Sequence, residues 1–259
     1  MNILVIGRGW TGKKVFNELL GRGHVVAFAS HKNAIEAVAQ GNYTMVVNCA
    51  GVTGTPNVDA CEKDRVNTVE GNAAFPILLH EACFTYGSYL AHFSSGCIYQ
   101  GDITDVNADP NFFGSIYSVS KGVSDLFLKD KALVFRIRMP FTGLNEPKNY
   151  LTKVYNYAEK AKLIDAGQNS LTDLDEAVRV ACDLIEDRSA TGPFNLVNKG
   201  SVNMHDLAEI MGIQPEWFTP EEFKDATVAG RSICTIPAYE GMSDVVEALS
   251  AAVHKMKNS

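Results

Sequence analysis

The segment from Asn111 to Lys121 holds a tyrosine and a lysine that a helix would bring together. It reads NFFGSIYSVSK, and of the nine tyrosines in the chain only Tyr117 has a lysine four residues later. Positions i and i+4 lie on one face of a helix, so Tyr117 and Lys121 would stand side by side. A neighbouring ammonium favours the ionised form of a phenol, whose ordinary pKa is about 10. The pair therefore indicates general acid or base chemistry rather than packing.

A second motif stands at the start of the chain, where the apolar run NILVI at 2–6 is followed by G-x-G-x-x-G. The motif consists of Gly7, Arg8, Gly9, Trp10, Thr11 and Gly12. Glycines at this spacing let the backbone turn tightly and approach a pyrophosphate, which binds the free N–H groups of the next helix. The helical pattern from residue 11 and the apolar run HVVAFA at 24–29 supply the flanking elements. We therefore expect a dinucleotide site rather than an ordinary strand-to-helix turn.

The end of the second expected strand indicates which dinucleotide is bound. An acidic residue there would bind the adenosine ribose of NAD and repel a phosphate. This chain has Ser30, His31 and Lys32 at that point, and Arg8 lies in the glycine loop. The positive charge favours NADP(H) over NAD(H). The alternative is that these side chains are simply solvated at a surface turn.

Length and charge limit the classes of protein to consider. With 259 residues and 46% hydrophobic content, the chain suits one compact α/β unit with an attached lobe, or two small domains. The formal net charge is -7 and the sequence pI is about 5.4. Because nucleic-acid phosphates need a basic face, we expect no nucleic-acid partner.

Cysteine usage and the lack of long apolar runs point to a compartment. The six cysteines form neither a C-x-x-C pair nor a spacing typical of zinc, so we expect reduced thiols and no metal site. Met1 leads directly into the first apolar run, and no run approaches the roughly 20 residues that span a bilayer. We expect a cytoplasmic protein that is not embedded in a membrane.

Strand and helix patterns alternate up to about residue 140. The expected strands are 2–6, 24–29, 44–49, 88–95 and 132–139, and the expected helices are 11–21, 33–39, 58–86 and one from Tyr117. This alternation predicts an α/β fold with a Rossmann-type doubly wound parallel sheet, covered by helices on both faces.

Beyond Pro140 the pattern becomes less regular. The expected elements are helices near 150–162 and 173–187, a strand at 193–197 and a C-terminal helix near 242–256. Ligands of open α/β sheets bind outside the carboxyl ends of the strands. We therefore expect residues 1–145, with 171–197 returning to them, to form the dinucleotide-binding domain. Residues 146–170 and 198–259 would form a smaller substrate-binding lobe.

Taken together, these runs make the chain resemble the extended short-chain dehydrogenase/reductases of the nucleotide-sugar branch. The resemblance is closest to the bifunctional 3,5-epimerase/4-reductases that make nucleotide-linked rhamnose and to dTDP-4-dehydrorhamnose reductase. It extends over nearly the whole chain. The runs that carry it are NCAGVTGTPNVDACE at 48–62, SSGCIY at 94–99, NFFGSIYSVSK at 111–121, RIRMP at 136–140, NEPKNYLTK at 145–153 and NSLTDLDE at 169–176.

The resemblance implies a catalytic triad for reduction. Ser95, in SSGCIY, would hold the substrate carbonyl oxygen while Tyr117 donates a proton to it and the nicotinamide delivers hydride. Lys121 would bind the cofactor ribose and lower the pKa of Tyr117. The alternative for Ser95 is a hydroxyl that caps a turn at the end of a strand.

The resemblance also implies an acid/base pair for epimerisation. A 4,6-dehydratase of this superfamily has Asp-Glu after the serine, whereas this chain has Gly96 and Cys97, so dehydration is not expected. Cys97 and Lys153 would exchange protons at the carbons beside the keto group. The alternatives are a buried apolar thiol and a solvated helix lysine.

Further positions follow from the same resemblance. Ala50, Gly51, Asn72 and Pro140 would contact the cofactor, in addition to the glycine loop, Tyr117 and Lys121. The residues implied to contact the substrate are Ser95, Gly96, Cys97, Asn149 and Arg231. The guanidinium of Arg231 would bind the substrate diphosphate, since its planar fork can bind two oxygens at once.

The function that we expect is NADPH-dependent reduction, with 3,5-epimerisation, of a nucleotide-linked 4-keto-6-deoxyhexose to a sugar such as UDP- or dTDP-rhamnose. One alternative is an NAD-dependent nucleotide-sugar 4-epimerase that keeps its cofactor bound. Another is a non-catalytic dinucleotide-binding subunit that regulates a partner enzyme. The resemblance also allows a homodimer.

Overall fold

A six-stranded parallel sheet lies at the centre of the computed structural model, which describes residues 1–187 and 189–258. Its strand order is β10-β6-β4-β3-β1-β2. The strands are β1 (Asn2–Ile6), β2 (Val25–Ala29), β3 (Met45–Asn48), β4 (Tyr89–Ser95), β6 (Leu133–Ile137) and β10 (Gly192–Asn195). Because the order runs outward in both directions from β1, the carboxyl ends of β1 and β3 flank a crevice of the kind that binds ligands.

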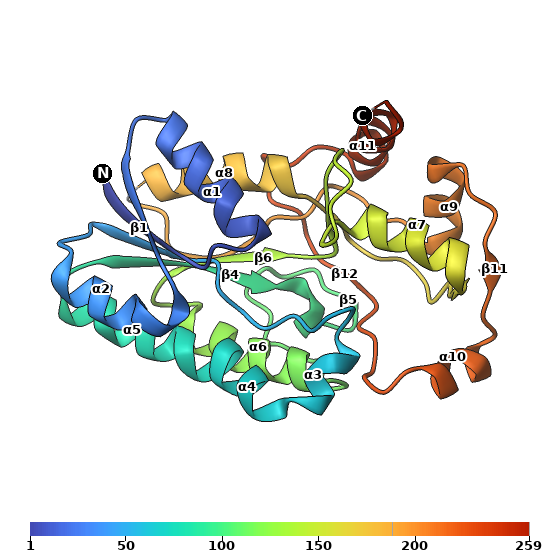
Figure 1. The fold of residues 1–259 in the computed structure, drawn as a ribbon, viewed down its shortest axis with the longest axis horizontal. Helices are drawn as coiled ribbons and strands as arrows, with labels where there is room; N and C mark the ends of the chain where they lie inside the picture. The colour runs from blue at the N-terminus through green and yellow to red at the C-terminus, as the bar shows by residue number, and fades with distance from the viewer. Residues whose placement is uncertain (188, 259) are drawn as a thin grey trace.

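Helices cover both faces of this sheet (Figure 1). One face carries α1 (Trp10–Gly21) and α8 (Leu174–Glu186). The other carries α2 (Ala34–Gln40), α5 (Phe75–Thr85) and α6 (Ile116–Leu128). This is the doubly wound architecture that the alternating pattern predicts, so the predicted fold class is confirmed.

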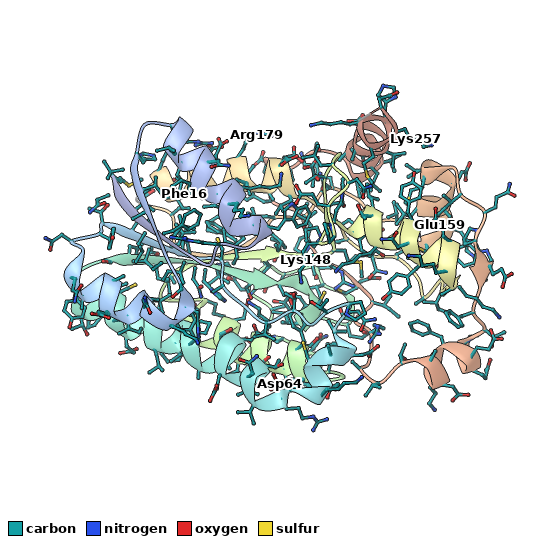
Figure 2. The ribbon with its side chains drawn as sticks, viewed as in Figure 1. Phe16, Asp64, Lys148, Glu159, Arg179 and Lys257 are labelled. Atoms are coloured by element: carbon teal, nitrogen blue, oxygen red, sulfur yellow. The ribbon has the colours of Figure 1, made fainter. Side chains whose placement is uncertain are left out.

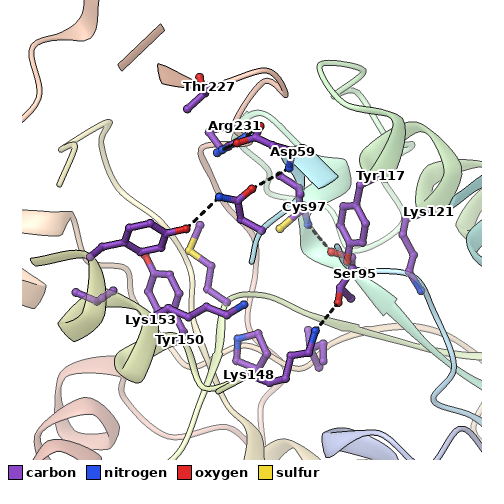
Figure 3. Close-up of a pocket in the computed structure, with 18 of the residues that line it drawn as sticks. Asp59, Ser95, Cys97, Tyr117, Lys121, Lys148, Tyr150, Lys153, Thr227 and Arg231 are labelled. Atoms are coloured by element: carbon purple, nitrogen blue, oxygen red, sulfur yellow. Dashed lines mark hydrogen bonds and ion pairs between the residues drawn. The ribbon is translucent and has the colours of Figure 1, made fainter. Parts of the chain in front are cut away.

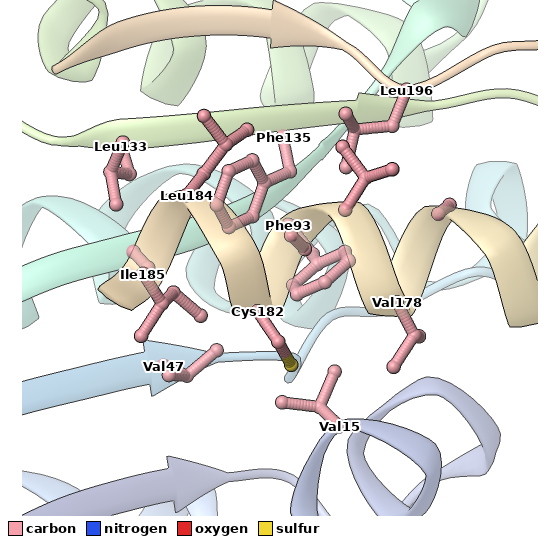
Figure 4. Close-up of a cluster of buried hydrophobic side chains, with 14 of the residues drawn as sticks. Val15, Val47, Phe93, Leu133, Phe135, Val178, Cys182, Leu184, Ile185 and Leu196 are labelled. Carbon is pink, nitrogen blue, oxygen red and sulfur yellow. The ribbon is translucent and has the colours of Figure 1, made fainter. Parts of the chain in front are cut away.

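Alternate side chains of the central strands enter two separate cores. Ile3 and Val5 of β1 belong to the core on the side of α1 and α8. In Figure 4, Phe93 of this core lies near α8. Leu4 and Ile6 of the same strand pack on the side of α2 and α5. Since successive strand residues point to opposite faces and both faces are buried, these strands read as continuous apolar runs rather than as alternating ones.

The long helix expected over 58–86 is broken in the structure. It consists of α3 (Asp59–Lys63), α4 (Arg65–Val69), the π-helical turn η2 (Glu70–Ala74) and then α5. Asp64 causes the first break, because its backbone leaves the helical region (φ -132°, ψ 65°) and its carboxylate caps α4. The helical periodicity continues across these breaks, which is why the pattern suggests one helix.

A lobe built mainly from later residues lies beside the sheet, at the right of Figure 1. Its helices are α7 (Tyr150–Lys160), α9 (Met204–Met211), α10 (Pro220–Ala226) and α11 (Val245–Lys257). Leu151, Leu207 and Leu249 centre its own hydrophobic core. None of the helices within the described residues has the length and apolar character needed to cross a bilayer.

Short parallel strand pairs join segments that are distant in the sequence. The pairs are β5 (Gly101–Asp102) with β12 (Cys234–Thr235), β7 (Pro140–Phe141) with β9 (Thr172–Asp173), and β8 (Lys162–Leu163) with β11 (Glu216–Trp217). The segment 171–197 contributes α8 and β10 to the region of the large sheet. The exact division into a dinucleotide-binding domain and a substrate-binding lobe stays a prediction.

A buried ion pair fixes α6 to the sheet. Asp125 of α6 and Arg136 of β6 are fully buried, and they form two hydrogen bonds of 2.5 and 3.0 Å. The hydroxyl of Ser94 on β4 donates a third hydrogen bond to the same carboxylate, at 2.7 Å. Because α6 carries Tyr117 and Lys121, this cluster sets where both side chains lie relative to the end of β4.

Removing the carboxylate of this cluster should destabilise the protein strongly. In Asp125→Ala the buried guanidinium of Arg136 loses its counter-charge, so we expect the free energy of unfolding to fall by about 3–5 kcal/mol. Urea unfolding measures this change. The control is Asp109→Ala, whose carboxylate pairs with Lys129 at 2.5 Å but is 68% exposed, and whose loss should cost less than about 1 kcal/mol. Equal losses in the two variants would contradict the proposed anchoring role.

Candidate active site

A cavity of about 640 Å³ opens at the carboxyl ends of the strands and brings most of the expected site residues together. The expected residues that line it are Gly9, Trp10, Thr11, Ala50, Gly51, Ser95, Cys97, Tyr117, Lys121, Pro140, Lys153 and Arg231. They come from both the sheet region and the lobe. The cavity is therefore the candidate active site.

The glycine loop has the geometry that a pyrophosphate site needs. Gly7 has φ +94°, and a Cβ there would lie 2.9 Å from the backbone nitrogen of Ala50. A Cβ on Gly12 would lie 1.9 Å from the carbonyl oxygen of Gly7, so both glycines are needed for close packing of α1. By contrast, a Cβ on Gly9 would meet no atom within 4 Å, and α1 starts there without a side-chain cap. Open space beside free N–H groups fits a dinucleotide phosphate.

The residues expected to select the cofactor lie beyond the end of β2 and do not line the cavity. Ser30 is exposed and precedes η1 (His31–Asn33), in which His31 and Lys32 are also exposed. Arg8 is exposed as well, and its guanidinium lies 5.4 Å from the centre of the Phe28 ring. These residues present positive and polar groups at this corner of the sheet.

Asn72 supports the cofactor crevice from behind rather than lining it. It is fully buried in η2, where its amide accepts from the N–H of Val52 and donates to the carbonyl of Val52, both at 2.8 Å. A Cβ on Gly51 would lie 3.1 Å from both the Asn72 Oδ1 and the Lys121 Nζ. The lack of a side chain at Gly51 therefore lets this loop lie directly over Lys121.

Ser95, Tyr117 and Lys121 converge at one wall of the cavity (Figure 3). Ser115 caps the start of α6 by accepting from the N–H of Ser118, which places Tyr117 in the first turn and Lys121 one turn later. Ser95 ends β4, and its hydroxyl is hydrogen-bonded to the Tyr117 phenol.

Burial decides the protonation of two of these groups. It raises the pKa of Tyr117, an effect that Cys97 reinforces and the Ser95 hydrogen bond opposes. The net shift of the Tyr117 pKa is therefore upward, because burial of the phenolate outweighs the groups that lower this pKa, and the expected lowering by Lys121 stays a prediction. Burial also lowers the pKa of Lys121 to about 8. Tyr117 is consequently a neutral phenol that can donate a proton.

Cys97 and Lys153 face the same space from different elements. Cys97 lies in η3 (Gly96–Ile98), directly after β4, whereas Lys153 lies in the first turn of α7. In Figure 3, Lys153 and Tyr150 approach from α7, opposite Ser95, Cys97 and Tyr117. Burial and the charge of Lys148 both lower the pKa of Lys153, which brings its amine closer to use as a base.

Arg231 lines the cavity but is held by a carboxylate that the sequence analysis did not single out. Its guanidinium binds both carboxylate oxygens of Asp59, at 3.0 and 2.8 Å, and this pairing lowers the pKa of Asp59 to about 2. The backbone N–H groups of Val228 and Ala229 also donate to Asp59. Contact of Arg231 with a substrate diphosphate stays a prediction.

Three of the further residues that line the cavity have titratable side chains that bear on its charge, namely Asp59, Lys148 and Tyr150. Asp59 and Lys148 lie within the runs 48–62 and 145–153 that carry the family resemblance, so those runs were the available signal. Lys148 lies near the centre of the view in Figure 2, and its ammonium donates to the hydroxyl of Thr53 at 3.3 Å. Burial raises the pKa of Tyr150, the third residue, to about 12.

Two of the residues expected to contact the substrate, Asn149 and Gly96, are not among those that line the cavity, and their contact with substrate stays a prediction. Asn149 is fully buried and does not line the cavity. Its amide donates to the carbonyls of Thr142 and Leu144 and accepts from the N–H of Leu151, which caps α7. Gly96 is also buried, and a Cβ there would meet the side chains beside it rather than the cavity. The amide of Asn149 is thus fully used inside the fold.

The open space at Gly9 yields a direct test of cofactor binding. In Gly9→Val the added side chain would fill the space beside the start of α1, so we expect the affinity for NADPH to fall about tenfold or more. Fluorescence titration measures the affinity, and thermal unfolding checks that the fold is intact. Gly21→Val is the matched control, because Gly21 ends the same helix and its Cβ would also meet no atom. An unchanged affinity in Gly9→Val would place the cofactor elsewhere.

Comparison with known proteins agrees with this geometry. The chain is 31% identical over 273 aligned positions to the bifunctional dTDP-4-dehydrorhamnose 3,5-epimerase/dTDP-4-dehydrorhamnose reductase of Arabidopsis thaliana, which covers 96% of this chain and 89% of that protein. It is also 31% identical to the trifunctional UDP-glucose 4,6-dehydratase/UDP-4-keto-6-deoxy-D-glucose 3,5-epimerase/UDP-4-keto-L-rhamnose-reductase RHM1 of the same plant. That match covers 96% of this chain but 40% of RHM1, so the chain spans less than half of the trifunctional protein.

Solved structures show the same fold. The L780 UDP-rhamnose synthase from Acanthamoeba polyphaga mimivirus superimposes with a TM-score of 0.88 at 26% identity, covering 98% of this chain and 99% of that one. The dTDP-4-dehydrorhamnose reductase of Clostridium acetobutylicum superimposes with a TM-score of 0.81 at 19% identity, covering 99% and 100% of the two chains. The family model of the RmlD substrate binding domain matches residues 1–220. The chain therefore belongs to the RmlD substrate-binding-domain family.

Proposed function

We propose that this protein reduces a nucleotide-linked 4-keto-6-deoxyhexose with NADPH, after epimerising it at C3 and C5, and so forms a sugar such as UDP- or dTDP-rhamnose. One observation carries the proposal: Ser95, Tyr117 and Lys121 share a single cavity with Cys97 and Lys153. The activities of the relatives in Arabidopsis thaliana and of the mimivirus synthase support it.

Ser95 and Tyr117 would act together on the C4 carbonyl. Their hydroxyls would donate to the carbonyl oxygen, and Tyr117, which burial keeps neutral, would give up its proton as the oxygen becomes an alcohol. A bound NADPH would supply the hydride for this reduction. The ammonium of Lys121 would stabilise the tyrosinate that remains until solvent restores its proton.

Cys97 and Lys153 would act on the carbons beside that carbonyl. A proton next to a ketone becomes removable when the electron pair of the C–H bond can move onto the carbonyl oxygen, where Ser95 and Tyr117 stabilise the enolate. One group would remove the proton on its face of the ring, and the other would return a proton on the opposite face. Epimerisation and reduction would thus share one carbonyl site.

The cofactor is proposed to be NADP(H). Gly9, Trp10 and Thr11 would hold its pyrophosphate, and the exposed Arg8 and Lys32 would lie near a 2′-phosphate, where no acidic residue occupies the end of β2. One related structure contains NADP and another contains NAD. These structures support a nicotinamide dinucleotide as the cofactor without favouring NADP over NAD. The cytoplasmic location and the homodimer stay predictions.

A turnover assay tests the reduction directly. Purified protein with UDP- or dTDP-4-keto-6-deoxyglucose should oxidise NADPH faster than NADH, and mass spectrometry with NMR should identify the reduced deoxy sugar. Tyr117→Phe removes the proton donor, so kcat should fall by about 10²–10⁴-fold. The control is Tyr155→Phe on α7, whose hydroxyl donates to the carbonyl of Met211 away from the cavity and whose loss should leave kcat nearly unchanged.

Each other outcome of this assay has a definite meaning. Copurified NAD and no net oxidation of NADPH would indicate a 4-epimerase. Cofactor binding without turnover of either substrate would indicate a non-catalytic subunit and would remove the proposal.

Removing the thiol should separate the two reactions. In Cys97→Ala the proton exchange at C3 and C5 should be lost, while reduction of an already epimerised 4-keto-rhamnose nucleotide should persist. Deuterium uptake from D₂O, read by NMR, measures the exchange. Cys83→Ala is the control, because Cys83 is buried in α5 and does not line the cavity. Retained exchange in Cys97→Ala would exclude Cys97 as the acid/base group.

A further inference from the structure

Arg138 is a fully buried arginine beside the active-site cavity, and none of the hydrogen-bond partners that the described residues give it is a carboxylate. Its guanidinium donates to the carbonyl of Gly96 at 3.4 Å, to the hydroxyl and carbonyl of Ser232 at 2.9 and 2.8 Å, to the amide oxygen of Asn169, and to the sulfur of Cys97 at 3.3 Å. Among the described residues, no carboxylate is a partner of this guanidinium, and its Nε has no hydrogen-bond acceptor. Such a charge is expensive to bury unless an anion compensates it.

The neighbouring Arg136 shows what a compensated arginine looks like in this fold. It lies two residues earlier, is equally buried, and is paired with Asp125. Arg138 follows the same strand but points its Nη1 toward the active-site wall, where Cys97 is the ionisable partner. Two buried arginines that are two residues apart thus have different partners: Arg136 pairs with a carboxylate, and Arg138 contacts a thiol.

Two acceptors hold the Arg138 guanidinium in place, and each of them is oriented by a hydrogen bond that it donates elsewhere. The Ser232 hydroxyl donates its hydrogen to the carbonyl of Tyr99 at 2.6 Å, so toward Arg138 it can only accept. The Asn169 amide nitrogen donates to Gly167, which turns its oxygen toward Arg138. These contacts prevent the guanidinium from turning away from the thiol.

Gly96 makes the approach of the arginine to the thiol possible. A Cβ on Gly96 would lie 2.9 Å from the Cδ1 of Ile236 and 3.3 Å from the Cβ of Arg138, so both side chains need the space that the glycine leaves. The glycine between Ser95 and Cys97 therefore gives the arginine room to pass beneath the loop. This is a packing reason for a residue that the sequence analysis assigned to the substrate.

We propose that Arg138 is a positioning residue for epimerisation, which holds the sulfur of Cys97 as a thiolate at the cavity wall. This inference rests on the proposed function. The thiolate accepts the proton from the carbon beside the C4 carbonyl: the C–H bond breaks, an S–H bond forms, and the electron pair moves to the carbonyl oxygen. The Lys153 ammonium returns a proton to the opposite face, and solvent carries the proton from sulfur back to the amine. No oxidant or reductant is consumed.

The other titratable groups around Cys97 cannot replace Arg138 in this role. Tyr117 from α6, Tyr150 from α7 and Cys234 from β12 all interact with Cys97, and burial raises the pKa of each of them. They are neutral, and as anions they would repel a thiolate. Lys153 faces the cavity from α7, and its lowered pKa makes its ammonium a proton donor rather than a permanent charge. Arg138 is the permanently charged cation that contacts the sulfur.

The pH dependence of Cys97 alkylation in the unmodified protein tests this role without any substrate. The rate of Cys97 modification by iodoacetamide is followed from pH 5 to pH 10 by mass spectrometry of the Cys97 peptide. Its midpoint should lie at least one unit below the value of about 8.5 for a free thiol. A midpoint at or above that value would overturn the proposal. Because neither sugar nor NADPH is present, this result is independent of the proposed turnover.

Variants of Arg138 separate positioning from a merely structural role. Arg138→Gln should raise the alkylation midpoint by a unit or more and slow deuterium exchange at C3 and C5 at least tenfold, while reduction of an already epimerised substrate changes less than threefold. Arg138→Lys should restore part of both losses. Arg179→Gln, which changes an exposed arginine at the periphery of Figure 2, is the matched control.

The contrary results are equally definite. An unchanged midpoint in Arg138→Gln, or an equal loss of exchange and reduction in a folded variant, would overturn the proposal. If Arg138→Gln does not fold, the titration of the unmodified protein decides the question alone.

Discussion

The free-energy cost of burying positively charged side chains determines how the region around the active site is built. Lys121, Arg136 and Arg138 are all buried near the ends of β4 and β6, and one carboxylate, that of Asp125, interacts with the first two. The hydrogen bonds of this carboxylate to Ser94 and Arg136 tie α6 to two strands, which fixes the helix that supplies the proton donor. The third cation, Arg138, contacts the sulfur of Cys97 at the cavity wall instead of a carboxylate.

Desolvation shifts the pKa values of the phenol and of the amines in this cavity in opposite directions. It raises the pKa of the Tyr117 phenol, which keeps the proton donor loaded, and it lowers the pKa values of Lys121 and Lys153. A phenol that keeps its proton suits reduction, and an amine that can release one suits proton exchange at carbon. Burial is the largest cause of each shift, and it separates the pKa values of groups that would all be protonated in neutral water.

Local pattern was enough to predict the large elements but not the connections between them. The strand expected at 2–6 matches β1, and the helix expected at 173–187 matches α8 within one residue at each end, because apolar periodicity is a property of contiguous residues. The strand pairs β5–β12 and β8–β11 have two residues per strand, too few to show a period, and join residues more than 50 positions apart. The break at Asp64 likewise depends on its backbone conformation, which the helical pattern does not reveal.

The same distinction applies to the site. Gly9, Ser95, Tyr117 and Lys121 could be predicted because each belongs to a contiguous run, and the structure places all four at one cavity. The pair of Asp59 and Arg231 is separated by 172 positions, and that of Cys97 and Arg138 by 41, so no spacing indicates either contact. Spacing also fixes which face of α6 a group lies on but not how far water is excluded from it. The helical spacing of Tyr117 and Lys121 therefore does not show that burial raises the pKa of Tyr117, because the dielectric around a helix face is set by the strands and loops that cover it, here the end of β4 and the loop at Gly51.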